Sequence, residues 1–228
     1  MKMENKGIVF SPFGPFVYLG KLSESTFFEL ESRIEEVRGN ESRDVGDKLA
    51  GRLVQQYDIT DVCSKSIYEE IISHLKHKYT ELETMTGLDY QSGIDWNEIW
   101  IDSLWANIQK AGEYNPPHIH NGMYSFVIYT KIDMTREEAL DNRFDKQKGQ
   151  TLAGHLELRY GETAFANFNY YSHWPEIGDI IIFPSWLQHC VHSFYKEGAE
   201  RISVAGNFQM GNTDAMGIIQ KTNILKQD

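Results

Sequence analysis

The second half of this chain is a series of short β-type segments with almost no helical pattern between them. From Trp96 onward it is rich in aromatic and β-branched residues and is broken by short turn signals, which is typical of strands. Without crossover helices, such strands indicate an antiparallel sandwich or barrel and argue against a βαβ fold. The expected strands are Trp100–Gln109, Met123–Ile132, Gly154–Tyr160, Asp179–Phe183, Gln188–Phe194 and Arg201–Met210, with Phe165–Tyr171 as a further candidate.

The first half indicates two amphipathic helices. Thr26 followed by Glu29 fits a capping box at the start of the first helix. The second is expected over about Asp61 to Leu82, with His74 and His77 off its apolar stripe and on the solvated surface. The apolar stripes are Phe27, Leu30, Ile34 and Val37 in the first helix, and Ile67, Ile71, Leu75 and Tyr79 in the second.

Length and charge narrow the class of protein further. The 228 residues suit one domain, with a helical support over about residues 1–90 and a β core over about 96–210. A net charge of −11 makes nucleic acid an unfavourable partner. Two cysteines are too few for a disulfide framework. With no signal-peptide pattern and no apolar run long enough for a membrane span, a cytoplasmic location is expected.

Three histidines and one arginine suggest a metal site. His118 and His120, two positions apart in an extended segment, project from the same side of the backbone. His189, at the start of a later strand, can complete a facial set of ligands around one divalent ion. His192 is three residues further on and faces the opposite way. The layout therefore indicates a non-haem iron oxygenase.

Arg201 is the first residue of the last expected strand. Its side chain lies on the same face as Ser203, Ala205 and Asn207, which are small or polar where a core face would have large apolar residues. A buried arginine needs an anion, and a guanidinium binds a carboxylate through two hydrogen bonds. That anion is either the carboxylate of a cosubstrate or an acidic side chain of the protein. Likewise, His189 is either a ligand or a hydrogen-bonded core histidine.

From Trp100 to Met210 the chain resembles the Fe(II)- and 2-oxoglutarate-dependent dioxygenases, and most of all the bacterial and phage oxygenases related to prolyl hydroxylases. The carrying motifs are Trp105-Ala106-Asn107-Ile108, Tyr114-Asn115-Pro116-Pro117-His118-Ile119-His120, Ser125-Phe126-Val127-Ile128-Tyr129, Phe183-Pro184-Ser185-Trp186-Leu187-Gln188-His189-Cys190-Val191 and Arg201-Ile202-Ser203-Val204-Ala205-Gly206-Asn207-Phe208. The final series, from the Phe-Pro-Ser-Trp corner to Asn207, is the most specific.

This resemblance implies a mainly β fold, a double-stranded β-helix (jelly-roll, cupin-like) core with supporting α-helices. It implies Fe(II) as the metal, with 2-oxoglutarate and O2 as cosubstrates, and His118 and His189 as iron ligands. The activity implied is hydroxylation of a small molecule or a protein side chain, with release of succinate and CO2.

The resemblance also implies how 2-oxoglutarate binds. Arg201 is expected to pair with its distal carboxylate, and Ser203 and Tyr129 to donate hydrogen bonds to the same group. Asn107 is expected to line the pocket.

One position departs from the family pattern. His120 stands where the common pattern has an acidic residue, so three neutral ligands leave the iron with its full charge of about +2, which the dianion of 2-oxoglutarate neutralises. Alternatively, His118 and His189 alone bind the metal and water takes the third place. A three-histidine dioxygenase or isomerase of the cupin type, which uses no 2-oxoglutarate, and a non-enzymatic jelly-roll binding module remain as alternatives.

Other conspicuous residues have structural interpretations. Trp186 is expected to serve packing, and His155 and His173 to be surface or structural residues. The charged segment 134–150 is either a lid beside the site or a solvated connection. The aromatic segment Gly161–Pro175 either faces the substrate or is an ordinary sheet surface.

Overall fold

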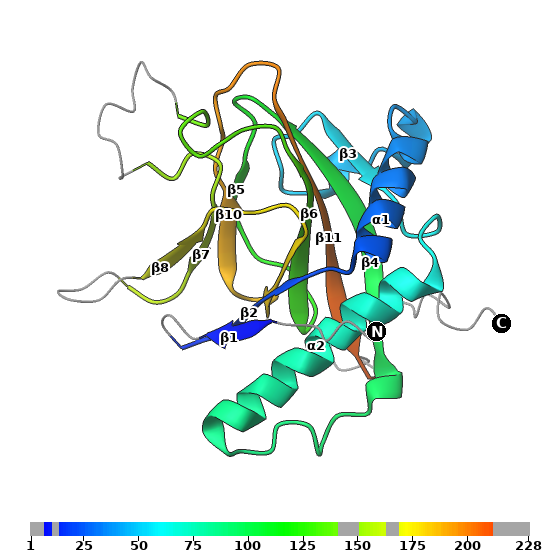
Figure 1. The fold of residues 1–228 in the computed structure, drawn as a ribbon, viewed down its shortest axis with the longest axis vertical. Coiled ribbons are helices and arrows are strands. Elements are labelled where there is room, and N and C mark those ends of the chain that lie inside the picture. Colours follow the sequence, from blue (N-terminus) through cyan, green and yellow to red (C-terminus); the bar gives the residue numbers. More distant parts are fainter. Residues whose placement is uncertain (1–6, 11–13, 141–150, 163–168, 212–228) are drawn as a thin grey trace.

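Two antiparallel sheets of unequal size form the body of the protein (Figure 1). The computed structural model describes residues 7–10, 14–140, 151–162 and 169–211. The larger sheet has the strand order β1-β2-β9-β6-β11-β4-β3, and the smaller has the order β5-β10-β7-β8. The strands are β1 (Ile8–Phe10), β2 (Val17–Lys21), β3 (Gln55–Asp58), β4 (Ile99–Lys110), β5 (Asn115–His118), β6 (Tyr124–Ile132), β7 (Leu156–Arg159), β8 (Tyr170–His173), β9 (Asp179–Pro184), β10 (Gln188–Val191) and β11 (Glu200–Met210).

An apolar cluster joins the two sheets. Tyr129 and Ile181 come from the larger sheet, Leu156 and Leu158 come from the smaller, and all four are at most 2% exposed. Each such side chain contributes about 1.5–3 kcal/mol when fully buried. Two antiparallel sheets packed around one core form the expected double-stranded β-helix, so the predicted mainly β fold is confirmed.

Helices α1 (Glu24–Val37) and α2 (Lys65–Thr86) cover the outer face of the larger sheet (Figure 1). Leu30 and Ile34 of α1, with Ile71 of α2, pack in the largest apolar cluster, together with residues of β4, β6, β9 and β11. Helix α2 ends at Gly87, whose φ of +68° is a left-handed conformation that glycine adopts without strain. No helix in the described ranges is long and apolar enough to cross a membrane.

Each strand expected in the second half overlaps an observed strand, but four strands were missed. Strands β1, β2 and β3 join the larger sheet, so the first sixty residues are not only helical. They have three to five residues each, too few for a periodic signal. The segment before His118 contains two prolines and gave no strand signal. It is the edge strand β5, where a missing N–H is tolerated.

The helices also differ from the expectation in detail. Ser23, not Thr26, caps α1, because its hydroxyl accepts a hydrogen bond from the backbone N–H of Thr26. Helix α2 begins at Lys65, four residues later than expected. His74 is fully buried and lies 2.8 Å from the Tyr18 hydroxyl, so the prediction that it lies on the surface was wrong. The predicted division into a helical support and a β core remains a prediction.

Candidate metal and cosubstrate site

The three histidines of the predicted ligand set meet at one point. His118 ends β5, His120 follows two residues later, and His189 lies on β10 opposite His118 in the antiparallel pair. Their ligand nitrogens all lie within 4.8 Å of one another. The ring centroids are 4.2 Å apart for His118 and His189, 4.9 Å for His118 and His120, and 5.1 Å for His120 and His189. This arrangement fits three ligands of one transition-metal ion.

Backbone carbonyl groups orient two of these imidazoles. Nδ1 of His118 lies 2.7 Å from the carbonyl oxygen of Pro116, and Nδ1 of His189 lies 2.9 Å from that of Leu187. A carbonyl can only accept a hydrogen bond, so each Nδ1 carries the proton and each Nε2 keeps a free lone pair. Such hydrogen bonds fix the orientation and tautomer of metal-binding histidines in proteins.

Burial keeps the three rings neutral. Desolvation lowers the pKa of His118, and it lowers the pKa of His120 to about 4 and that of His189 to about 3, with the neighbouring imidazoles adding to the effect at the last two. A metal ligand must be the neutral imidazole, because a protonated ring has no lone pair to donate. All three are therefore ready to bind a metal at neutral pH.

A buried cation lies in the same cavity. Arg201 of β11 is 3% exposed, and its guanidinium donates hydrogen bonds to the carbonyl of Gly154 and to Oε1 of Gln109. Both acceptors are neutral, and within the described part of the chain no carboxylate pairs with Arg201. The alternative of an internal salt bridge therefore has no support among these residues, and the buried positive charge remains available to an anion.

Three further polar residues lie in one row across the larger sheet. Ser203 of β11 pairs with Asn107 of β4 on one side and with Tyr129 of β6 on the other. The Tyr129 hydroxyl is buried without a hydrogen-bond partner among the described residues. Burial raises its pKa to about 12, so it stays protonated and can donate. A carboxylate bound here would accept hydrogen bonds from the Arg201 guanidinium and from the Tyr129 hydroxyl. The site therefore fits the distal carboxylate of 2-oxoglutarate.

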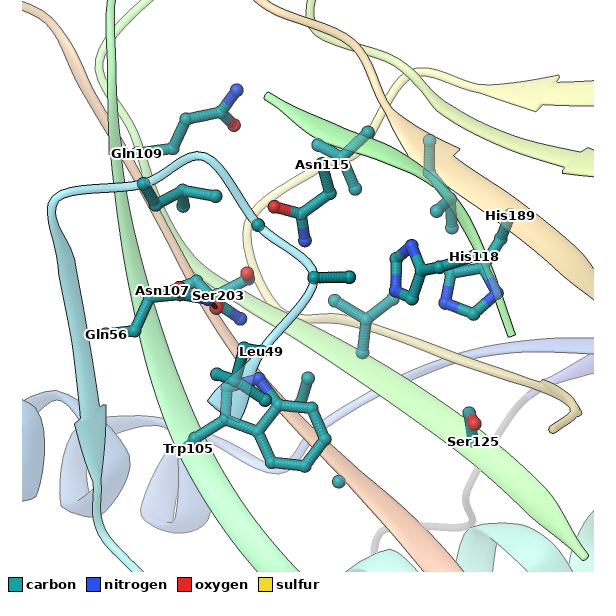
Figure 2. Close-up of a pocket in the computed structure, with 18 of the residues that line it drawn as sticks. Leu49, Gln56, Trp105, Asn107, Gln109, Asn115, His118, Ser125, His189 and Ser203 are labelled. Atoms are coloured by element: carbon teal, nitrogen blue, oxygen red, sulfur yellow. Dashed lines mark hydrogen bonds between the residues drawn. The ribbon is translucent and has the colours of Figure 1, made fainter. Parts of the chain in front are cut away.

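The three histidines and the polar residues around Arg201 line one cavity. Figure 2 shows His118 and His189 on one side of this cavity, with Asn107, Ser203 and Gln56 on the other. All seven residues predicted for the site line this cavity. Sequence reasoning missed several other lining residues, among them Gln109, Gln56, Asn115, Trp105 and the segment Leu49–Gly51. Trp105 and Gln109 had a signal, because each lies two positions from Asn107 on the same strand and so on the same face.

Two of the remaining histidines, His155 and His173, have structural contacts. His155 is buried, with Nδ1 3.1 Å from the Ala153 carbonyl, and Nε2 of His173 lies 2.9 Å from Asp179. His192 points away from the cavity, as expected. Trp186 was expected to serve packing, but it is 53% exposed, and its ring centroid is 5.9 Å from that of Tyr160. This exposure arises because Trp186 lies in the turn between β9 and β10. Two segments were left with alternative roles, the charged segment 134–150 and the aromatic segment Gly161–Pro175. Their residues 141–150 and 163–168 lie outside the described residues.

Comparisons with known proteins agree with this geometry. The model of the family described as "Putative 2OG-Fe(II) oxygenase" matches residues 103–207, a little under half of the chain. No curated protein matches the sequence. Among solved structures, a Pseudomonas putida prolyl-4-hydroxylase is similar, with a TM-score of 0.53 at 12% identity over 91% of this chain and 94% of that one.

A prolyl hydroxylase from Trichoplax adhaerens, solved with a peptide fragment of the hypoxia inducible factor oxygen degradation domain, has a TM-score of 0.50 at 12% identity. The similarity covers 94% of this chain and 88% of that one. At such low identity these structures support the fold alone. The family match identifies the β core, residues 103–207, as similar to the Fe(II)- and 2-oxoglutarate-dependent oxygenases. This match and the three-histidine group support Fe(II) as the cofactor and 2-oxoglutarate and O2 as the cosubstrates.

Proposed function

We propose that this protein hydroxylates a C–H bond of a small molecule or a protein side chain, with conversion of 2-oxoglutarate to succinate and CO2. One observation carries the proposal: three neutral imidazoles and a buried guanidinium without a carboxylate partner among the described residues line the same cavity. The imidazoles suit a divalent metal, and the guanidinium suits the carboxylate of a bound 2-oxo acid.

In this proposal His118, His120 and His189 would hold Fe(II), the first and last of them through Nε2, because the carbonyls of Pro116 and Leu187 accept hydrogen bonds from their Nδ1 atoms. When bound, iron and 2-oxoglutarate supply the oxidising chemistry with O2, and the protein supplies position and exclusion of water. Three neutral ligands do not reduce the charge of the metal, so the two negative charges of 2-oxoglutarate balance it.

Arg201 binds the distal carboxylate of 2-oxoglutarate, and Gln109 orients the guanidinium. Tyr129 and Ser203 donate hydrogen bonds to that carboxylate, and Asn107, which accepts a 2.7 Å hydrogen bond from Gln56, lines the pocket beside them. Because the guanidinium is desolvated, its attraction for an anion is stronger than at the protein surface.

A prolyl side chain is the first substrate class to test. Both fold relatives described above are prolyl hydroxylases.

The test is anaerobic addition of Fe(II) and 2-oxoglutarate, followed by O2. We expect a weak visible charge-transfer band from the chelate, then succinate, and a mass gain of one oxygen on a peptide from a proline-containing pool. His189→Ala should remove the band while the far-UV circular dichroism stays unchanged. A folded wild-type protein without the band, or with the same spectrum as His189→Ala, contradicts the proposal. Oxygen chemistry that does not require 2-oxoglutarate would support the cupin-type alternative.

A separate variant decides the role of His120. If His120 is the third ligand, His120→Ala weakens Fe(II) binding about 10- to 100-fold, a range typical of lost support at metal sites. If water fills that place, affinity stays within about twofold. Asn115→Ala, a change in the same cavity but outside the histidine set, is the matched control and should leave Fe(II) affinity unchanged.

A further inference from the structure

A second cluster of metal-ligating side chains lies on the other face of the strand that carries His189. On β10, His189 points into the cavity, so Cys190 points out of the opposite face of the smaller sheet. On β7, Leu158 packs in the apolar cluster between the sheets, so Glu157 faces the same way as Cys190. Glu157 and Cys190 are direct partners in the β7–β10 pair. His192 follows one residue after β10 and joins them.

The three side chains converge on one point. Their ligand atoms all lie within 4.8 Å of one another. Nε2 of His192 is 2.7 Å from Oε2 of Glu157 and 3.6 Å from Sγ of Cys190. With bonds of about 2.3 Å to sulfur and 2.0 Å to nitrogen, a tetrahedral zinc ion holds these two atoms about 3.5 Å apart. For the carboxylate oxygen to become the third ligand, its distance from Nε2 has to widen from 2.7 Å to about 3.3 Å.

The same geometry argues against a nucleophilic triad. In a Cys-His-acid triad, one imidazole nitrogen contacts the nucleophile and the other contacts the acid. Here both partners contact Nε2 of His192. That pattern brings three donors to a common centre and does not relay a proton from the thiol to the carboxylate.

Burial and charge also suit an ion. Glu157 is 2% and Cys190 5% exposed, while the His192 side chain is 31% exposed and gives access from solvent. Arg159 donates to Oε1 of Glu157, which leaves Oε2 free to turn towards a metal. A thiolate, a carboxylate and the arginine together carry a charge of −1, which favours a divalent cation. A thiolate among the ligands favours zinc over iron.

We propose that Glu157, Cys190 and His192 form a second metal site, which binds a thiophilic divalent ion of the zinc class with water as the fourth ligand. On binding, Cys190 loses its thiol proton to solvent. The single proton of His192, which lies on Nε2 in the hydrogen bond to Glu157, moves to Nδ1, so that Nε2 can donate its lone pair to the metal. The ion then links β7 to β10 directly behind His189. The proposal does not depend on the iron site, because it uses none of the residues of that site.

Cobalt(II) is the probe, because a cysteine ligand gives bound cobalt an intense near-ultraviolet charge-transfer band that histidine ligands do not give. We expect metal-free protein to bind two Co2+ ions and to develop this band with a stoichiometry of one. The double variant His118→Ala/His120→Ala should keep the band, which assigns it to the second site. Zn2+ added afterwards should remove it.

The two cysteines of the chain provide a matched pair of variants. Cys190→Ser should abolish the band, and Cys63→Ser should leave it unchanged. Glu157→Gln and His192→Asn, which keep the thiol, should shift the cobalt titration to at least about tenfold higher concentration; these two decide the question if far-UV circular dichroism shows Cys190→Ser to be unfolded. A folded wild type without the band overturns the proposal, and so does a band that persists in folded Cys190→Ser.

Discussion

Two buried cations of this protein differ in their surroundings. Arg201, in the cavity between the sheets, donates hydrogen bonds to a carbonyl and an amide oxygen. Lys78, in the contact between α2 and the larger sheet, is 1% exposed, and its Nζ lies 4.1 Å from the ring centroid of Tyr124 and 5.0 Å from that of Tyr79. Neither forms an ion pair within the described ranges. Arg201 lines the cavity of the candidate site, and Lys78 is not among the residues that line it.

The difference follows from the chemistry of the two groups. Desolvation lowers the pKa of Lys78 to about 7, so this amine can lose its proton and lie in an apolar contact as a neutral group. A guanidinium stays charged in proteins, and burial lowers the pKa of Arg201 without making it neutral at physiological pH. Arg201 therefore needs an anion from outside, whereas Lys78 needs none.

The largest effect is expected for Arg201→Met. Removing the guanidinium takes away the proposed main partner of the distal carboxylate of 2-oxoglutarate, and truncation of such a buried pair costs about 2–5 kcal/mol. We expect the Kd for 2-oxoglutarate, measured from the anaerobic charge-transfer band, to rise about 1,000-fold, or ~4 kcal/mol. Lys78→Met, the same substitution at the other cation, is the control and should bind 2-oxoglutarate like the wild type. A rise below about tenfold in Arg201→Met would show that the arginine does not bind the cosubstrate.

Lys78→Arg is expected to have the next largest effect. The introduced guanidinium cannot become neutral, so it brings an uncompensated charge into the contact between α2 and the sheet. A charge of this kind costs about 3 kcal/mol of the free energy of unfolding. Urea denaturation at pH 7 measures the loss. Stability equal to that of the wild type would mean that the contact admits water or an anion.

His74 and Lys78 also show where helix prediction from the sequence stops. A pattern of steps of four identified Ile67, Ile71, Leu75 and Tyr79, and all four are buried. The buried face of a helix also includes the positions three residues apart. His74 and Lys78 occupy such positions, and their polarity suggested solvent.

The sequence predicted the residues of the candidate site more completely than the other residues that line its cavity. Strand alternation placed His118 with His120, and Ser203 with Arg201, because a period of two decides which face a side chain takes. The order of His189 and Arg201 along the chain contributed to the family resemblance, which implied their roles. The segment Leu49–Gly51 reaches the cavity only through pairings distant in sequence, such as the bridge between Arg52 and Tyr114. No local pattern encodes such a pairing.

Lys78→Met is expected to stabilise the protein by about 2 kcal/mol at pH 7, since it replaces a costly buried amine with an apolar side chain of similar length. The gain should depend on pH. Between pH 7 and 10.5 the unfolded chain keeps the lysine proton that the folded protein has released, so wild-type stability from this residue rises with pH, by up to ~1.4 kcal/mol per unit. The difference between variant and wild type should therefore narrow from pH 7 to pH 9 in urea denaturation. A constant difference would mean that Lys78 does not titrate in this window.

Arg201→Lys places the residue type of position 78 into the cavity. It has the smallest expected effect at pH 7. An ammonium group keeps the charge but loses the two-pronged geometry of the guanidinium, so the Kd for 2-oxoglutarate should rise about tenfold, or ~1.4 kcal/mol. Desolvation in the cavity should lower the pKa of the introduced lysine, as it does for Lys78. Because only the protonated amine attracts the carboxylate, affinity in the variant should fall further from pH 7 to pH 9, while wild-type affinity changes little. If the affinity for 2-oxoglutarate had the same pH profile in both proteins, the lysine would stay protonated in the cavity. A permanently charged guanidinium would then not be what distinguishes the cavity from the helix contact.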